Sequence, residues 1–253
     1  MGRLGAFVYG IVAYVIFLAT FLYAIGFVGN ILVPKSMDSG ATGPFLQALA
    51  VDAVLLAIFA IQHSTMARPA FKRWARRFIP PPIERSTYVL MASLALALLF
   101  WQWQPLGGVI WQVEDEAARI ALRMVFWTGW LTVLVTTFLI DHFDLFGLRQ
   151  VYLYLRGREY SAIAFRTPGP YNFVRHPLYV GFLLAFWAAP TMTATHLVFA
   201  LATTAYILIA IQLEEHDLIA HYGETYRDYR ERVPMVLPLP KGRPAESVGA
   251  RVS

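Results

Sequence analysis

The sequence contains no cysteine and few charged residues. Without cysteine the chain has no disulfide bond, no thiolate metal ligand and no cysteine nucleophile. Only 15% of its 253 residues are Asp, Glu, Lys or Arg, whereas soluble domains carry about a quarter. A surface with so few charges is not polar enough for water. A soluble globular domain is therefore excluded.

Several motifs of soluble enzymes are also missing. The sequence has no Gly-x-Gly-x-x-Gly of a Rossmann cofactor site, no Walker loop, no His-Glu-x-x-His and no Gly-x-Ser-x-Gly. The spacing of His63, His142 and His176 matches no metal-binding pattern, so no metal site is predicted.

Apolar residues make up 58% of the chain and occur in long runs. A transmembrane helix needs about 20 mostly apolar residues. Six runs are candidates: residues 6–33, 45–66, 87–103, 120–140, 178–189 and 196–213. The last two are short and are separated only by residues 190–195. The pattern predicts an all-α, polytopic membrane helix bundle with about five to six transmembrane helices and a C-terminal helical hairpin.

Lysine and arginine concentrate in three segments, residues 67–85, 141–177 and the polar tail from residue 214. Basic residues collect in cytoplasmic loops of membrane proteins. All three segments fall on the cytoplasmic side if both termini are cytoplasmic, which is the predicted topology. The net charge of +5 then reflects membrane orientation. We expect lipid as a partner and no nucleic acid.

One polar cluster, residues 171–181, leads into the predicted hairpin. Pro177 suits the first turn of a helix, where its missing N–H costs nothing. Arg175 and His176 then lie at the mouth of the hairpin, beside a helix N-terminus that attracts anions. Tyr179 follows about one turn later. These residues either bind a ligand or anchor the helix at the membrane surface.

A second cluster is the carboxylate pair Glu214-Glu215, where the last apolar run ends. Negative charge is unfavourable at a helix C-terminus, so the sequence predicts a compensating positive group. Arg175, an arginine of the tail or a cationic ligand are the candidates.

Two further sites contain histidine, which can act as a base near neutral pH. His142 lies with Asp141 and Asp144 at the predicted cytoplasmic end of residues 120–140. His63 shares a helix face with Asp52, but at 1.5 Å per residue they are roughly 16 Å apart and do not touch.

The sequence Arg-His-Pro-Leu-Tyr-Val-Gly at residues 175–181 occurs together with Glu214-Glu215 and Tyr222-Gly223-x-x-Tyr226-x-x-Tyr229. This combination, over about residues 169–240, resembles the isoprenylcysteine carboxyl methyltransferase and phospholipid methyltransferase superfamily. Residues 62–69, 84–88 and 141–150 look like the methanethiol S-methyltransferase group, which is related to NnrU proteins.

The resemblance implies an enzyme that uses S-adenosyl-L-methionine at a cytoplasmic site. It implies a small thiol substrate, methanethiol, converted to dimethyl sulfide. The implied cofactor-binding residues are Tyr171, Arg175, His176, Pro177, Tyr179, Gly181, Glu214 and Glu215. Another thiol, a lipid or a prenylcysteine remains an alternative acceptor, and a non-catalytic NnrU-like role in nitrogen-oxide metabolism is a third possibility.

Methyl transfer to a thiol is helped by a group that removes the thiol proton. The candidates are His142, oriented by Asp144 or Asp141, and His63. The oligomeric state stays open.

The chain is interpreted as one integral membrane methyltransferase domain over residues 1–240. It would comprise a four-helix part (1–140), a cofactor-binding part (141–240) and a disordered tail (241–253). The resemblance implies a bacterial inner membrane.

Overall fold

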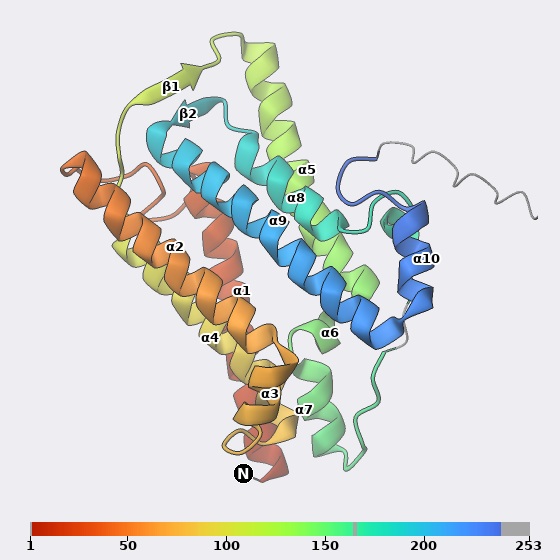
Figure 1. Cartoon of the computed structure of the whole chain (residues 1–253). Helices are drawn as coiled ribbons and strands as arrows, with labels where there is room; N and C mark the ends of the chain where they lie inside the picture. The colour runs from red at the N-terminus through yellow and green to blue at the C-terminus, as the bar shows by residue number, and fades with distance from the viewer. Residues whose placement is uncertain (1, 164–165, 239–253) are drawn as a thin grey trace, which may run out of the picture.

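A computed structural model describes residues 2–163 and 166–238, so the predicted tail lies outside the described residues. Five of its helices are long and apolar enough to cross a membrane: α1 (Arg3–Gly29), α2 (Phe45–Ala67), α4 (Pro81–Gln102), α5 (Glu116–Ile140) and α9 (Ala194–Tyr222). The shorter apolar helix α8 (Pro177–Trp187) forms a hairpin with α9 (Figure 1). The prediction of an all-α membrane bundle is confirmed. The division at residue 140 stays a prediction.

Short elements connect the long helices. They are α3 (Pro69–Ala75), α6 (His142–Leu145), α7 (Leu148–Leu155), the 3-10 helix η1 (Gly169–Asn172) and α10 (Glu224–Arg232). Strands β1 (Val109–Gln112) and β2 (Thr191–Thr193) pair antiparallel, which the sequence analysis did not predict. This small sheet joins the segment before α5 to the turn of the hairpin.

Local chemistry sets several helix boundaries. Prolines occupy the first turns of α3, α4 and α8, where no N–H is required. Asp115 begins α5 by accepting a hydrogen bond from the Ala118 amide at 2.8 Å. Thr193 caps α9 in the same way through the His196 amide at 3.0 Å.

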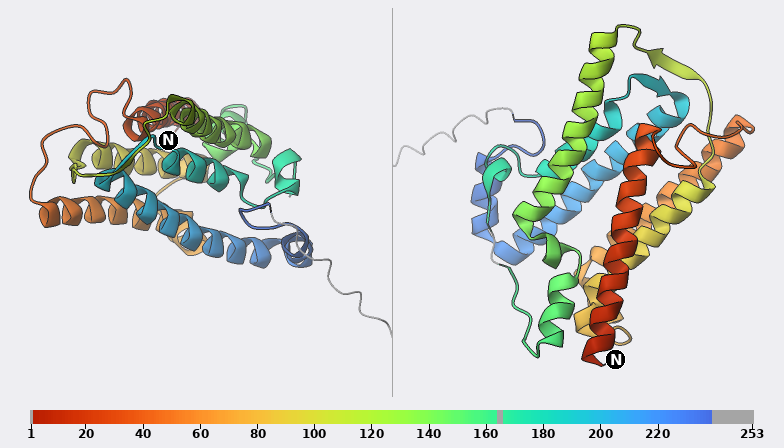
Figure 2. Two further views of the ribbon diagram at one scale, coloured as in Figure 1. Left: turned by 90° about the horizontal axis from the view of Figure 1, so that it is seen from above. Right: turned by 180° about the vertical axis from the view of Figure 1, so that it is seen from behind.

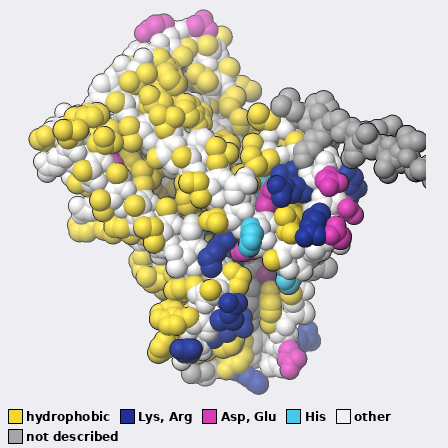
Figure 3. Space-filling view, viewed as in Figure 1, with side chains coloured by type: hydrophobic (Ala, Val, Ile, Leu, Met, Phe, Trp, Pro, Cys, Tyr) yellow, Lys and Arg dark blue, Asp and Glu magenta, His cyan; other side chains and the backbone are white. Residues whose placement is uncertain are grey.

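The long helices alternate in direction. Helices α1, α4 and α8 run one way, and α2, α5 and α9 run the other way (Figures 1 and 2). The connections containing α3 and α6–α7, and the chain after α9, consequently lie toward the end of the bundle opposite the sheet. Charged side chains gather toward that end in Figure 3, whereas apolar side chains cover much of the rest of the visible face. The described parts of the three basic segments therefore lie toward the same end of the bundle.

Helix α8 packs closely along α5. A Cβ atom added to Gly129 of α5 would lie 2.6 Å from the carbonyl oxygen of Gly181 on α8. Small residues allow such approach between membrane helices. This contact ties the hairpin, and the polar residues at its mouth, to the rest of the bundle.

Candidate active site

A buried ion pair lies at the mouth of the hairpin. Arg175 Nε donates to Glu215 Oε1 at 2.7 Å, and the two side chains are only 5% and 3% exposed. His176 Nε2 lies 3.0 Å from the same oxygen, and Arg230 Nε lies 3.2 Å from Glu215 Oε2. Arg175 Nη1 also donates to the carbonyls of Arg230 (3.0 Å) and Val233 (2.5 Å). These contacts join the start of α8, the middle of α9 and the segment around α10 into one frame.

The structure confirms the predicted positive partner of the glutamate pair. The predicted end of the helix that carries this pair was wrong. Helix α9 does not end near Leu213; it continues to Tyr222, so Glu215 lies within the helix. Arg175 and a tail arginine, Arg230, both contact Glu215. A buried carboxylate requires such partners because desolvating an unpaired charge is costly.

Glu214 is placed quite differently from its neighbour. Its side chain is 45% exposed, and the Tyr179 hydroxyl donates to Glu214 Oε2 at 3.1 Å. Burial and the negative charge of Glu214 both raise the pKa of Tyr171, which places that ring near the same carboxylate. Of the two glutamates, Glu214 is the one that a ligand can reach.

Tyrosines of α4 and α9 lie in the same region as Tyr179. Tyr88 of α4 interacts electrostatically with Glu214 and with Tyr206 of α9. Its hydroxyl lies 2.8 Å from His63 Nε2, and Tyr206 lies 3.1 Å from the Ser64 hydroxyl. Four tyrosines therefore cluster around one carboxylate, and we call this cluster the tyrosine recess: Tyr88, Tyr171, Tyr179, Tyr206 and Glu214.

The sequence analysis did not single out Tyr88 or Tyr206 as site residues. Each is a single tyrosine in or beside an apolar run. Tyrosine is common at membrane interfaces, so its presence there is a weak indication of a functional site. Arg68 belongs to the basic segment 67–85 and to residues 62–69, which carry part of the family resemblance, but no site role was predicted for it. In the fold it forms a 2.9 Å ion pair with Asp217, which ties the end of α2 to α9 beside the recess.

His142 is buried in a separate cluster. Its Nε2 lies 2.8 Å from the Tyr14 hydroxyl, and its Nδ1 lies 2.9 Å from the Thr137 hydroxyl. The ring stacks on Phe138 with centroids 4.2 Å apart. Burial lowers the pKa of His142, with Asp141 acting in the opposite direction. The imidazole is therefore neutral at pH 7, with both nitrogens engaged.

Neither expected aspartate orients this imidazole. Asp141 caps α6 by accepting from the Asp144 amide at 3.1 Å. Asp144 pairs with Arg149 at 2.9 Å and accepts from the Tyr160 hydroxyl at 3.2 Å. Both ring nitrogens of His142 contact hydroxyl groups instead, so the predicted His–Asp pair does not form.

Pro177 and Gly181 have structural positions within the site. Pro177 is in the first turn of α8, and Gly181 faces α5, where an added Cβ would lie 2.7 Å from the Gly129 carbonyl oxygen. The sequence motif thus combines residues that shape the hairpin with Tyr179, which faces the recess. Among the described residues no group of three or more His, Asp or Glu side chains is arranged to hold a metal ion.

The frame at Glu215 and the tyrosines at Glu214 lie together at the mouth of the α8–α9 hairpin. Residues 124–225, which include α8, α9 and most of α5, match the phospholipid methyltransferase family. The protein is an integral membrane methyltransferase.

The chain belongs to the methanethiol S-methyltransferase family. It is 55% identical over 240 residues to the methanethiol S-methyltransferase of Mycobacterium tuberculosis, covering 95% of this chain and 98% of that protein. It is 57% identical over 236 residues to methanethiol S-methyltransferase 2 of Bradyrhizobium diazoefficiens, covering 93% and 91%. Nurim of Mus musculus is 32% identical over 182 residues, covering 68% and 69%. No solved structure matches the chain.

Proposed function

We propose that the protein transfers a methyl group from S-adenosyl-L-methionine to methanethiol. The thiol sulfur forms a bond to the methyl carbon as the sulfonium–methyl bond breaks, and the thiol loses its proton. The products are dimethyl sulfide and S-adenosylhomocysteine. The identity to methanethiol S-methyltransferases over more than nine-tenths of the chain carries the choice of acceptor.

The recess fits the chemistry of the methyl donor. The half-exposed Glu214 carboxylate offers acceptors for ribose hydroxyls. Tyrosine faces offer surfaces for an adenine ring and for a cationic sulfonium. In this assignment Tyr171, Tyr179 and Glu214 contact the donor, whereas Arg175, His176 and Glu215 hold the frame behind them.

Positioning accounts for much of such catalysis. Methyl transfer requires the acceptor sulfur and the methyl carbon to be held in line, and this alignment can contribute several kcal/mol. The packing of α8 on α5 makes Tyr179 part of a rigid element, which serves that requirement.

We assign removal of the thiol proton to His63 acting with Tyr88. Tyr88 interacts electrostatically with Glu214 and hydrogen-bonds His63, so this pair borders the recess. His142 is tied to Tyr14 and Thr137 in its own cluster. Asp141 and Asp144 then serve the fold of the α6–α7 segment.

The inner membrane of a bacterium, with both termini in the cytoplasm, is the proposed location. The relatives from Mycobacterium and Bradyrhizobium are bacterial, and the three basic segments lie toward one end of the bundle (Figure 1). The tyrosine recess lies at that same end, where a soluble cofactor would have access.

One observation favours a lipid or prenylated acceptor as the alternative. An apolar groove of about 320 Å³ lies between α5 and α8, lined by residues such as Val125, Val180 and Leu184. Val180, which lines the groove, is the residue after Tyr179 on α8. Acceptor profiling separates the two readings.

The test is direct. Membranes containing the full chain are incubated with S-adenosyl-L-methionine and methanethiol, and dimethyl sulfide is measured in the headspace against membranes lacking the protein. We expect cofactor-dependent dimethyl sulfide. Cofactor binding without this product, together with methylation of a lipid or prenylcysteine, would establish the alternative acceptor. Absence of both binding and product would overturn the proposal.

A further inference from the structure

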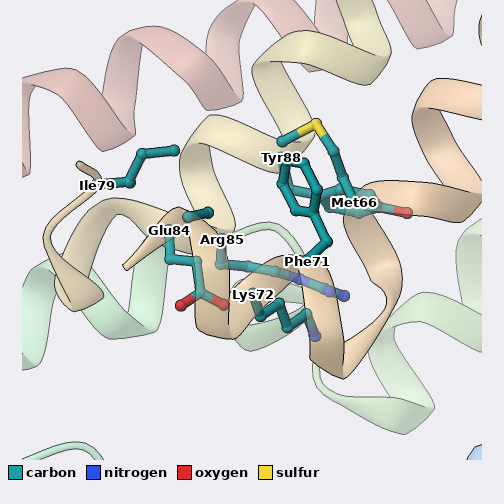
Figure 4. A pocket seen from close by; sticks show the side chains of 8 residues that line it. Met66, Phe71, Lys72, Ile79, Glu84, Arg85 and Tyr88 are labelled. Atoms are coloured by element: carbon teal, nitrogen blue, oxygen red, sulfur yellow. The ribbon is translucent and has the colours of Figure 1, made fainter. Parts of the chain in front are cut away.

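A small pocket has Tyr88 in its lining. It is enclosed by the end of α2, by α3 and by the start of α4 (Figure 4). Its volume is about 20 Å³, enough for one water-sized group. Such a pocket suits the end of a ligand rather than a whole molecule. Its lining residues are Met66, Phe71, Lys72, Ala75, Ile79, Glu84, Arg85 and Tyr88.

Two cations line this pocket side by side. Both Lys72 and Arg85 are partly buried, and in the part of the chain that the structure describes neither forms a salt bridge. Arg85 Nε donates to the Leu145 carbonyl at 2.7 Å, and its guanidinium lies 5.2 Å from the centroid of the Tyr88 ring. In Figure 4 the charged ends of Lys72 and Arg85 point to the same side of the pocket.

The one acidic residue in the lining is engaged elsewhere. Glu84 pairs with Arg76 at 3.0 Å, and its carboxylate points away from the ends of Lys72 and Arg85 (Figure 4). Burial lowers the pKa of Lys72, and Arg85 lowers it further, with Glu84 opposing them. The pocket therefore holds more positive than negative charge, and its cations are partly removed from water. An anionic group bound there would stabilise the charged forms of Lys72 and Arg85.

Tyr88 links the pocket to the tyrosine recess, and Arg68, two residues after the pocket residue Met66, contacts Leu213 and Asp217 on either side of Glu214. Tyr88 belongs to both, because it lines the pocket and interacts electrostatically with Glu214. The methionine end of the methyl donor has an α-carboxylate that needs a cationic partner. Arg175, the residue expected to meet it, is buried against Glu215 and two backbone carbonyls. Lys72 and Arg85 are partly buried cations for which the described part of the chain shows no salt bridge to a carboxylate.

We propose that Lys72 and Arg85 form the subsite for the α-carboxylate of the methyl donor. This inference rests on the proposed function, and it orients the donor. Lys72 and Arg85 would hold the methionine carboxylate and Glu214 would hold the ribose, with Tyr88 near both. Arginine and lysine are the usual partners of carboxylates, and charge-assisted hydrogen bonds are about twice as strong as neutral ones.

The experiment compares two ligands that differ only in this group. Equilibrium binding of S-adenosyl-L-methionine and of its decarboxylated analogue is measured on the purified full chain for wild type, Lys72→Met and Arg85→Met. Wild type should bind the intact donor roughly ten- to a hundredfold more tightly than the analogue. Each variant should lose most of this preference by weakening the intact donor alone.

Arg77→Met is the matched control, because Arg77 is an exposed cation just after α3; it should keep the wild-type preference. Arg85→Lys should retain part of the preference for the intact donor that Arg85→Met loses. Thermal unfolding verifies that each variant is folded. An unchanged preference in both Met variants, or equal weakening of both ligands, would overturn the subsite. An affinity loss that appears only with anionic lipid vesicles would instead assign the pocket to a lipid headgroup.

The outcomes separate the two proposals. If wild type does not bind S-adenosyl-L-methionine, the proposed function fails. If wild type binds it and the variants keep their preference for the carboxylate, only the subsite fails.

Discussion

Two adjacent glutamates on α9 have different environments. The Glu215 side chain is 3% exposed and contacts Arg175, His176 and Arg230. The Glu214 side chain is 45% exposed, accepts a hydrogen bond from Tyr179, and lies 3.8 Å from His176 Nδ1. Successive helix positions point about 100° apart, so one carboxylate is directed into the frame and the other toward the recess.

This difference predicts that the same Glu→Gln substitution weakens ligand binding at one position and lowers stability at the other. Glu214→Gln should weaken S-adenosyl-L-methionine binding about tenfold while leaving the thermal unfolding midpoint unchanged. Glu215→Gln should lower stability by about 3 kcal/mol, because it leaves Arg175 buried without its carboxylate. Equilibrium binding and thermal unfolding of the purified chain measure the two effects. A loss of stability in both variants would contradict the assignment of Glu214 to the ligand.

The two histidine clusters predict different kinetics. His63→Gln and Tyr88→Phe should each lower kcat about 100-fold at pH 7. The deficit should shrink as pH rises, because more of the acceptor is then thiolate and needs no base. Steady-state rates across pH 6–9 measure this. If His142→Gln shows the pH-dependent deficit and His63→Gln does not, the base is His142.

At the level of elements, the contact between α5 and α8 holds the site together. Gly129 and Gly181 face one another, and an added Cβ on Gly129 would lie 2.6 Å from both the Gly181 carbonyl oxygen and the Ala185 amide nitrogen. Backbone atoms do not move aside as flexible side chains do. The spacing of the two helices therefore depends on the absence of a side chain at this point.

We expect Gly129→Ala to lower the free energy of unfolding by about 1–3 kcal/mol through overpacking, and to lower methylation by displacing Tyr179. Gly43→Ala is the control, since the nearest atom to its added Cβ is 4.0 Å away. Thermal unfolding and the dimethyl sulfide assay measure both variants. Equal stability of Gly129→Ala and Gly43→Ala would show that α5 and α8 can adjust.

The two ends of the molecule differ in charge. The sheet and the acidic residues before α5 lie at one end, and the basic segments with the recess lie at the other (Figures 1 and 3). This polarity is what the positive-inside rule uses to orient a membrane protein.

The natural lack of cysteine makes this orientation testable without background labelling. A single cysteine is introduced by Glu114→Cys at one end or by Arg77→Cys at the other; both native residues are exposed. A membrane-impermeant maleimide applied to intact spheroplasts should label the first variant. It should label the second only after permeabilisation. The reverse pattern would invert the proposed topology.

The sequence alone predicted a membrane environment, the long apolar helices and the methyltransferase family. Apolar runs of about 20 residues exclude water as the environment, and the Arg-His-Pro motif with Glu214-Glu215 indicates the methyltransferase superfamily. These are local properties, readable from neighbouring residues. The short strands were missed because their pairing is non-local, and α9 was cut short because its last two turns are polar.

The roles within the site depended on tertiary structure. The sequence predicted that Glu214-Glu215 needs a positive partner, but only the fold shows that Glu215 takes Arg175 and leaves Glu214 half exposed. His142 has two aspartates as close neighbours in sequence, yet Tyr14 and Thr137 occupy its ring nitrogens. Tyr88 comes to contact His63 because α4 packs between α1 and α2. Which polar groups meet is set by helix packing between distant segments, and single-sequence patterns do not encode that packing.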